Sequence, residues 1–118
     1  MATILVVDDE AQQREQIDRA LVQAGHQVEV ACSGNQAVSR LKEKRYHLLI
    51  TDLLMDDGTG FEVLEWVREN APGLPVLVCS SYAKPDNLKT FLTTHLYRIL
   101  RKPFRLDELL GQAKELLG

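Results

Sequence analysis

The sequence alternates short apolar runs with amphipathic stretches along its whole length. Three of the apolar runs are almost continuous in valine, isoleucine and leucine, as expected for strands that are buried on both faces of a sheet. Strands that alternate with helical patterns indicate right-handed β-α-β units and a parallel sheet covered by helices on both faces. The predicted strands are residues 3–8, 27–32, 47–52, 74–80 and 97–101.

The helices are predicted from apolar residues that recur at a spacing of three or four. Ile17, Leu21 and Ala24 indicate a first helix over residues 11–24. Gly25 is expected to end it, because glycine readily adopts the left-handed conformation that closes many helices. The other helices are marked by Ala37, Val38 and Leu41; by Phe61, Leu64 and Val67; by Leu88, Phe91 and Leu92 after Pro85; and by Leu106, Leu109, Leu110, Ala113 and Leu117, the last helix covering residues 107–117.

Five such units predict a doubly wound α/β fold, a (βα)5 three-layer sandwich with a five-stranded parallel sheet of order 2-1-3-4-5. The second strand, in which Val28 and Val30 flank Glu29, is expected at the edge of the sheet. A chain of 118 residues has the length of one ordinary domain. We therefore expect a single domain over residues 1–118, with no output domain after the last helix.

Composition excludes several classes of protein. The charged fraction of 26% is typical of a globular protein, and the apolar runs are far shorter than the ~20 residues of a membrane span. No basic segment precedes the first apolar run, which argues against a secretory signal. The absence of a basic stripe with interleaved aromatic residues argues against direct nucleic-acid binding. Cys32 and Cys79 lie in apolar runs and are expected to be buried free thiols, which favours the reducing cytoplasm.

Polar residues end four of the predicted strands. They are Asp8 and Asp9 at the end of the first strand, Asp52 at the end of the third, Ser80 at the end of the fourth and Lys102 directly after the fifth. In the order 2-1-3-4-5, ligands bind beyond the carboxyl ends of the strands, where the first and third strands are neighbours. The sequence therefore predicts that these residues converge on one rim of the sheet.

The charges of this set favour a particular chemistry. Three close carboxylates repel one another or bind a cation, and Mg²⁺ is the hard ion that carboxylates and water commonly hold. With Mg²⁺ and Lys102 present, the formal charges of Asp8, Asp9 and Asp52 are neutralised. A carboxylate such as Asp52 can attack phosphorus and form an aspartyl phosphate when neighbouring cations absorb the charge of the transferred oxygens.

The sequence resembles the receiver domain of two-component response regulators from "VVDDE" to "KPF". The matching motifs are the Asp8–Asp9 pair, Asp52 with Met55 and Gly58 behind it, Ser80, and Lys102 before Pro103. Each motif alone is weak, but their joint spacing is highly specific. The resemblance implies a signalling switch that catalyses only its own phosphoryl transfer and dephosphorylation.

The family's roles carry over residue by residue. The resemblance implies that Asp52 is the phosphoacceptor, that Asp9 binds Mg²⁺ directly and Asp8 largely through water, and that the Leu54 carbonyl is a further metal ligand. It implies that Lys102 and Ser80 contact the phosphoryl oxygens and that the small Ser81 lets the backbone approach them. It also implies a cis peptide bond between Lys102 and Pro103.

The family resemblance also implies partners. A sensor histidine kinase or a histidine phosphotransfer protein would donate the phosphoryl group. An output protein or a second copy of the chain would read the surface formed by helix four, strand five and helix five. No membrane or nucleic acid is expected to bind.

The sequence departs from the family pattern near strand five and after Asp52. Asp56 stands where proline is common, His95–Leu96 where a Gly–Ala pair is common, and Ile99 where the aromatic switch residue is common. Tyr97 is expected on the same strand face as Ile99 and could supply the ring instead. Asp56 and Asp57 are expected to solvate a loop in which Gly58 and Gly60 supply unusual backbone angles.

Other functions fit the same fold less well. A phosphatase of the haloacid dehalogenase type has a second acid two residues after its nucleophile, where this chain has Leu54. A flavodoxin requires a phosphate-binding loop after strand one, and "DDEAQQR" would repel a phosphate. A receiver-like module that binds its partner without being phosphorylated remains the alternative. The paired acids could also simply cap the first helix.

Overall fold

The computed structural model describes residues 2–53, 55, 60–81 and 97–118. Within these residues, parallel strands form one sheet in the order β2-β1-β3-β4-β5, which confirms the predicted topology. The strands are β1 (Thr3–Val7), β2 (Gln27–Ala31), β3 (Leu48–Thr51), β4 (Val76–Ser80) and β5 (Tyr97–Arg101). They agree with the predicted strands to within two residues at each end.

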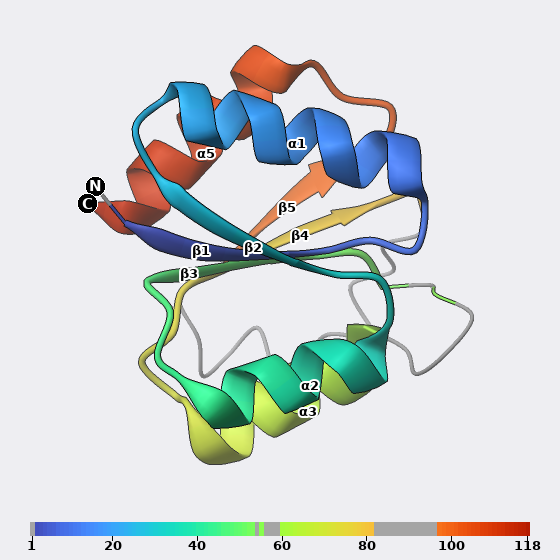
Figure 1. Ribbon diagram of the computed structural model, residues 1–118, viewed down its shortest axis with the longest axis vertical. Coiled ribbons are helices and arrows are strands. Elements are labelled where there is room, and N and C mark those ends of the chain that lie inside the picture. The colour runs from blue at the N-terminus through green and yellow to red at the C-terminus, as the bar shows by residue number, and fades with distance from the viewer. Residues whose placement is uncertain (1, 54, 56–59, 82–96) are drawn as a thin grey trace.

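The described helices cover both faces of the sheet. They are α1 (Ala11–Gln23), α2 (Gly34–Glu43), α3 (Gly60–Asn70) and α5 (Leu106–Leu117). Figure 1 shows α1 and α5 on one face and α2 and α3 on the other, so the molecule has three layers. The predicted fourth helix, marked by Pro85, Leu88, Phe91 and Leu92, lies outside the described residues.

Each face of the sheet has its own apolar core. Leu5 and Val7 of β1 pack toward α2 and α3, whereas Ile4 and Val6 pack toward α1 and α5. All four side chains are at most 1% exposed. Burial on both faces explains why these strands read as continuous apolar runs. In α5, Leu117 is expected to face the core, but it is only half-buried. The helix instead turns Leu116 toward the core that contains Leu109 and Ala113.

The edge strand β2 carries a polar cluster on the face covered by α2. The hydroxyl of Tyr46 donates to Oε1 of Glu29 at 2.9 Å, and Lys44 forms an ion pair with Glu29 and lies 5.6 Å from the centre of the Tyr46 ring. The hydrogen bond from Lys44 is the largest contribution that lowers the pKa of Glu29. Burial, followed by the bond to Glu29, raises the pKa of Tyr46 to about 12.

The two cysteines differ, which corrects the prediction that both are buried. Cys79 on β4 is 2% exposed, and burial raises the pKa of its thiol to about 12. Cys32 is exposed. It lies one residue beyond the end of β2, and its backbone N–H donates to the Gln36 side chain at 2.7 Å. The apolar run therefore extends past the strand into a turn, where the thiol faces solvent.

Short connections between helices and strands contain Gly25, His26 and His47. Gly25 has a φ of 96° and follows α1, which confirms the left-handed stop. His26 and His47 precede β2 and β3, and their Nδ1 atoms accept hydrogen bonds from the backbone N–H groups of Ala2 and Thr3. Among the helices in the described part of the chain, none combines the length and apolar character that crossing a membrane requires.

Candidate functional site

Asp8 and Asp52 lie side by side just beyond the ends of two neighbouring strands. The Asp8 N–H donates to the carbonyl of Ala31, and the Asp52 N–H donates to the carbonyl of Val7, each at 3.1 Å. These bonds extend the register of the sheet by one residue beyond β1 and β3. The sheet itself therefore fixes the two carboxylates at the same rim, as the topology predicted.

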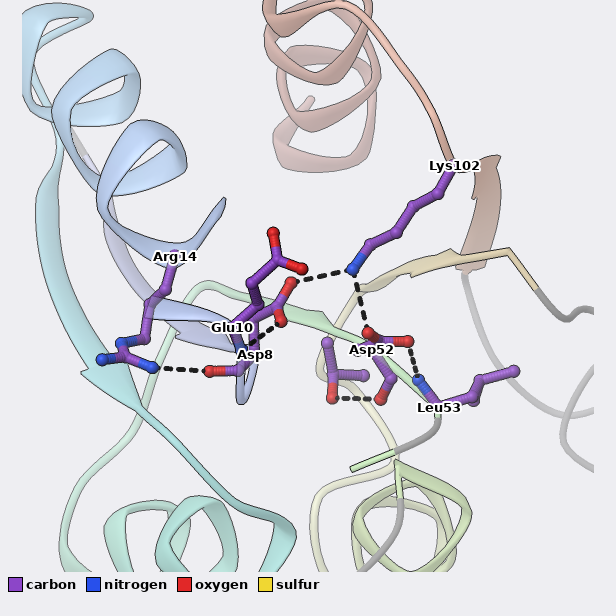
Figure 2. Close-up of polar contacts among 7 residues, drawn as sticks. Asp8, Glu10, Arg14, Asp52, Leu53 and Lys102 are labelled. Carbon is purple, nitrogen blue, oxygen red and sulfur yellow. Dashed lines mark hydrogen bonds and ion pairs between the residues drawn. The ribbon is translucent and has the colours of Figure 1, made fainter. Parts of the chain in front are cut away.

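Lys102 forms an ion pair with each of the two carboxylates. Its Nζ lies 2.9 Å from Oδ2 of Asp8 and 2.9 Å from Oδ2 of Asp52. Figure 2 shows the lysine side chain reaching from the end of β5 to a point between the two acids. The side chains of Asp8, Asp52 and Lys102 are 3%, 12% and 19% exposed, so solvent screens these ion pairs only weakly.

The surroundings of Lys102 favour the charged form of its side chain. Burial alone would lower the pKa of the ammonium group. The hydrogen bonds to Asp52 and Asp8, together with the attraction of their negative charges, outweigh burial and raise the pKa above the ordinary value. A permanently charged ammonium group at this position can neutralise a third anionic group that enters the rim.

Asp9 completes a group of acids that could hold a metal ion. One carboxylate oxygen from each of Asp8, Asp9 and Asp52 lies within 4.8 Å of the others. Asp9 is exposed, whereas Asp8 is buried, so the group opens to solvent on the side of Asp9. An all-oxygen donor set that is partly open to water suits Mg²⁺, which keeps several of its waters.

Asp8 is held at each of its polar atoms. Its N–H donates to Ala31 and its Oδ2 accepts from Lys102, as described above. Its Oδ1 accepts from the Glu10 N–H at 2.9 Å. Its backbone carbonyl accepts from Nη1 of Arg14 at 2.8 Å. Sequence reasoning did not identify Arg14. The available signal was an arginine at the fourth position of the helix that begins two residues after the acidic pair.

Asp52 is fixed by its sequence neighbours and by α3. Its Oδ1 accepts from the Leu53 N–H at 2.7 Å, and the Thr51 hydroxyl donates to its carbonyl at 2.9 Å. A Cβ atom built on Gly60 would lie 2.0 Å from that carbonyl oxygen and 2.6 Å from Cα of Leu53. Only a residue without a side chain lets α3 begin this close to the Asp52 backbone.

This role of Gly60 differs from the predicted one. Among the described residues, Gly25 and Gly118 are the glycines with positive φ, so Gly60 is not needed for a left-handed backbone. Its missing side chain instead provides space. Gly58, Asp56 and Asp57, which the sequence predicts in the same loop, lie outside the described residues, as does the Leu54 carbonyl.

The predicted phosphoryl-binding residues lie at the same end of the sheet as Asp52. Ser80 is the last residue of β4 and is 1% exposed, and its carbonyl accepts from the Lys102 N–H at 3.1 Å. Ser81 follows it and is exposed. The peptide bond between Lys102 and Pro103 is cis, as the resemblance implied.

Ile99 lies farther from the rim. It is 37% exposed in the middle of β5, in register with Val78. Tyr97, two residues earlier, is partly buried against the core under α2 and α3. The sequence also departs from the family pattern at His95 and Leu96, which lie outside the described residues.

Comparison with known sequences agrees with this arrangement. The response regulator receiver domain family matches residues 4–114. Response regulator MprA of Mycobacterium avium is 34% identical over 114 residues, which are 97% of this chain and 50% of that protein. The probable transcriptional regulatory protein TcrX of Mycobacterium tuberculosis is 30% identical over 98% of this chain and 49% of its own length. The chain thus spans about half the length of these relatives.

Solved structures show the same fold over nearly the whole chain. Chemotaxis response regulator CheY4 of Vibrio cholerae superposes with a TM-score of 0.88 at 29% identity, covering 98% of both chains. Response regulator TrrA of Thermotoga maritima, in complex with Mg²⁺ and BeF, has a TM-score of 0.86 at 28% identity and covers 98% of this chain and 99% of that one. The chain therefore belongs to the receiver domain family of two-component response regulators, which are signalling phosphoacceptors rather than classical enzymes.

Proposed function

We propose that Asp52 accepts a phosphoryl group from a phosphohistidine of a sensor histidine kinase or a histidine phosphotransfer protein. The observation that carries the proposal is the position of Asp52 between Lys102, at 2.9 Å, and the acids Asp8 and Asp9. A nucleophilic carboxylate beside both a cation and a cation-binding group is the arrangement that phosphoryl transfer to an aspartate requires.

The side chains have distinct parts in the transfer. An oxygen of Asp52 attacks phosphorus, the P–N bond of the donor breaks, and the imidazole of the donor keeps the electron pair. The Leu53 N–H, bonded to Oδ1 of Asp52 at 2.7 Å, limits rotation of the carboxylate. Lys102, already directed at Oδ2 of Asp52, pairs with an oxygen of the phosphoryl group.

The acids would hold Mg²⁺. Asp9, Asp8, Asp52 and the Leu54 carbonyl are the proposed protein ligands, with Asp8 acting largely through water. When bound, Mg²⁺ neutralises charge on the transferred phosphoryl oxygens. Asp8 is held toward the rim by the Glu10 N–H, so its carboxylate needs little rearrangement to take part.

Ser80 and β5 would pass the signal to a partner. We propose that the Ser80 hydroxyl bonds a phosphoryl oxygen and that Ser81 leaves room for the group. The consequent shift favours one of two arrangements of the surface formed by helix four, β5 and α5. Ile99, 37% exposed on β5, belongs to that surface, which an output protein or a second copy of the chain would bind.

We further propose that residues 1–118 act as a single domain and work in the cytoplasm. The unpaired Cys32 and Cys79 fit a reducing compartment.

The experiment is incubation with acetyl phosphate and Mg²⁺ followed by intact-mass measurement. The wild-type chain should gain one phosphoryl group, and Asp52→Asn should gain none. Asp107→Asn, an exposed aspartate at the start of α5, is the matched control and should react like the wild type. A wild-type chain that gains no adduct would instead support the module that binds its partner without phosphorylation, and an adduct on Asp52→Asn would place the reaction elsewhere.

A further inference from the structure

Arg14 contacts the acidic rim through a backbone carbonyl. Its Nη1 donates to the backbone carbonyl of Asp8 at 2.8 Å. Figure 2 shows Arg14 on one side of Asp8 and Lys102 on the other. The arginine therefore holds the main chain of the acidic pair, while Lys102 holds the side chain of Asp8.

This contact ties the acidic pair to the core. Arg14 lies in α1, and Ile17, one turn further along, is 1% exposed beneath the helix. The position of α1 against the sheet is thus fixed by apolar packing. The bond from Arg14 transmits that fixed position to the short segment between β1 and α1.

The carbonyl of Asp8 belongs to the peptide unit that leads into Asp9. Because a peptide unit is planar, a bond that fixes the carbonyl also fixes the N–H of Asp9 and the direction in which its backbone leaves. Asp9 is exposed, so less of it is held by packing than of the buried Asp8. The bond from Arg14 therefore also constrains the backbone of the more exposed acid.

We propose that Arg14 is a positioning residue for Mg²⁺, holding the Asp8–Asp9 peptide so that both carboxylates face Asp52. The inference rests on the proposed function. Groups that orient metal ligands typically change metal affinity by about 10- to 100-fold when removed. For an arginine that acts through a main-chain carbonyl we expect the lower end of that range.

The test is calorimetric titration of the unphosphorylated chain with MgCl₂. Arg14→Met should raise the dissociation constant of Mg²⁺ about tenfold. Arg14→Lys, whose ammonium group can still donate to the carbonyl, should restore most of the affinity. Arg19→Met is the matched control, because Arg19 lies on the same helix and pairs with Glu15 on the surface, and it should bind like the wild type.

A second readout separates positioning from a general loss of structure. In phosphorylation by acetyl phosphate, Arg14→Met should raise the half-saturating Mg²⁺ concentration about tenfold and leave the rate at saturating Mg²⁺ within about twofold of the wild type. Should Arg14→Met not fold, Arg14→Gln, which is too short to make the same contact, takes its place with the same expected values.

The results distinguish a failure of the role of Arg14 from a failure of the proposed function. A folded variant without the arginine that binds Mg²⁺ within twofold of a phosphorylatable wild type would overturn the role of Arg14 and leave the proposed function intact. No recovery in Arg14→Lys, or a loss confined to the saturated rate, would also overturn it. A wild-type chain that neither binds Mg²⁺ nor gains a phosphoryl group would refute the proposed function, and this inference with it.

Discussion

The Nζ atom of Lys102 lies 2.9 Å from Oδ2 of Asp52, although the two residues are 50 positions apart in the chain. Both side chains are less than one-fifth exposed. Removing either one therefore leaves the other as a largely buried charge without this partner, which is unfavourable. We expect a coupling free energy of about 1 to 3 kcal/mol between them. Urea unfolding without Mg²⁺ of the wild type, Lys102→Met, Asp52→Asn and the double variant measures it.

A surface pair on α1 provides the comparison for this cycle. Arg19 and Glu15 approach to 3.0 Å, but their side chains are 75% and 63% exposed. Their coupling should be about 0.3 to 0.5 kcal/mol, as for other exposed pairs on helices. A coupling of Lys102 with Asp52 no larger than this would contradict the structure.

Replacing Gly60 with alanine should be strongly destabilising. The added Cβ would lie 2.0 Å from the Asp52 carbonyl, so either α3 or the Asp52 backbone must move. We expect a loss of about 2 to 4 kcal/mol in the free energy of unfolding, measured with urea.

The matched control for this change is Gly111→Ala in α5. A Cβ on Gly111 meets nothing within 4 Å, and alanine favours the helix over glycine by about 1 kcal/mol. Gly111→Ala should therefore stabilise the chain. If both substitutions had the same sign, close packing would not explain Gly60.

The Tyr46 hydroxyl should make stability depend on alkaline pH. Because the folded pKa of about 12 is above the ordinary 10.0, the folded chain keeps the phenol proton longer than the unfolded chain. The associated stability is complete below pH 10 and is lost as the pH rises to about 12.

Comparison with Tyr46→Phe isolates this contribution. The variant lacks the bond to Glu29 and should be less stable than the wild type by about 1 kcal/mol at neutral pH. The difference should shrink between pH 10 and 12. Urea unfolding across this range tests it, and a difference that does not change with pH would show that the phenol is not held in its protonated form.

Magnesium should stabilise the folded chain if the acids bind it as proposed. At a concentration 100 times its dissociation constant, a ligand specific to the folded state adds about 2.7 kcal/mol to the free energy of unfolding. Asp9→Asn should reduce this gain, because Asp9 is one of three carboxylates within 4.8 Å. Unfolding curves with MgCl₂ and with KCl at equal ionic strength measure the effect, and an equal gain in both salts would indicate screening alone.

Much of the fold follows from periodicity in the sequence. Strands such as β1 are apolar on both faces because both faces are covered, and that pattern is visible in the sequence alone. The convergence of Asp8, Asp52 and Lys102 could be predicted for a related reason. Parallel strands place their carboxyl ends at one rim, so the topology alone brings these residues together.

Features that depend on exact spacing could not be predicted. The apolar character of residues 27–32 does not reveal that β2 ends at Ala31 and leaves Cys32 in a turn. The need for glycine at position 60 arises from the distance between α3 and the Asp52 carbonyl, which depends on how two elements pack. Likewise, the reach of Arg14 to a backbone carbonyl depends on where α1 begins.

The contrast between the two cysteines gives this protein a natural attachment point for a reporter group. Because Cys79 is buried and its pKa is about 12, almost none of it is the reactive thiolate at neutral pH. Cys32 is exposed and directly follows Ala31, whose carbonyl binds the Asp8 N–H. A thiol-reactive fluorophore should therefore label the native sequence at one position, next to the acidic rim, and allow metal binding and phosphorylation to be followed in real time without an engineered cysteine.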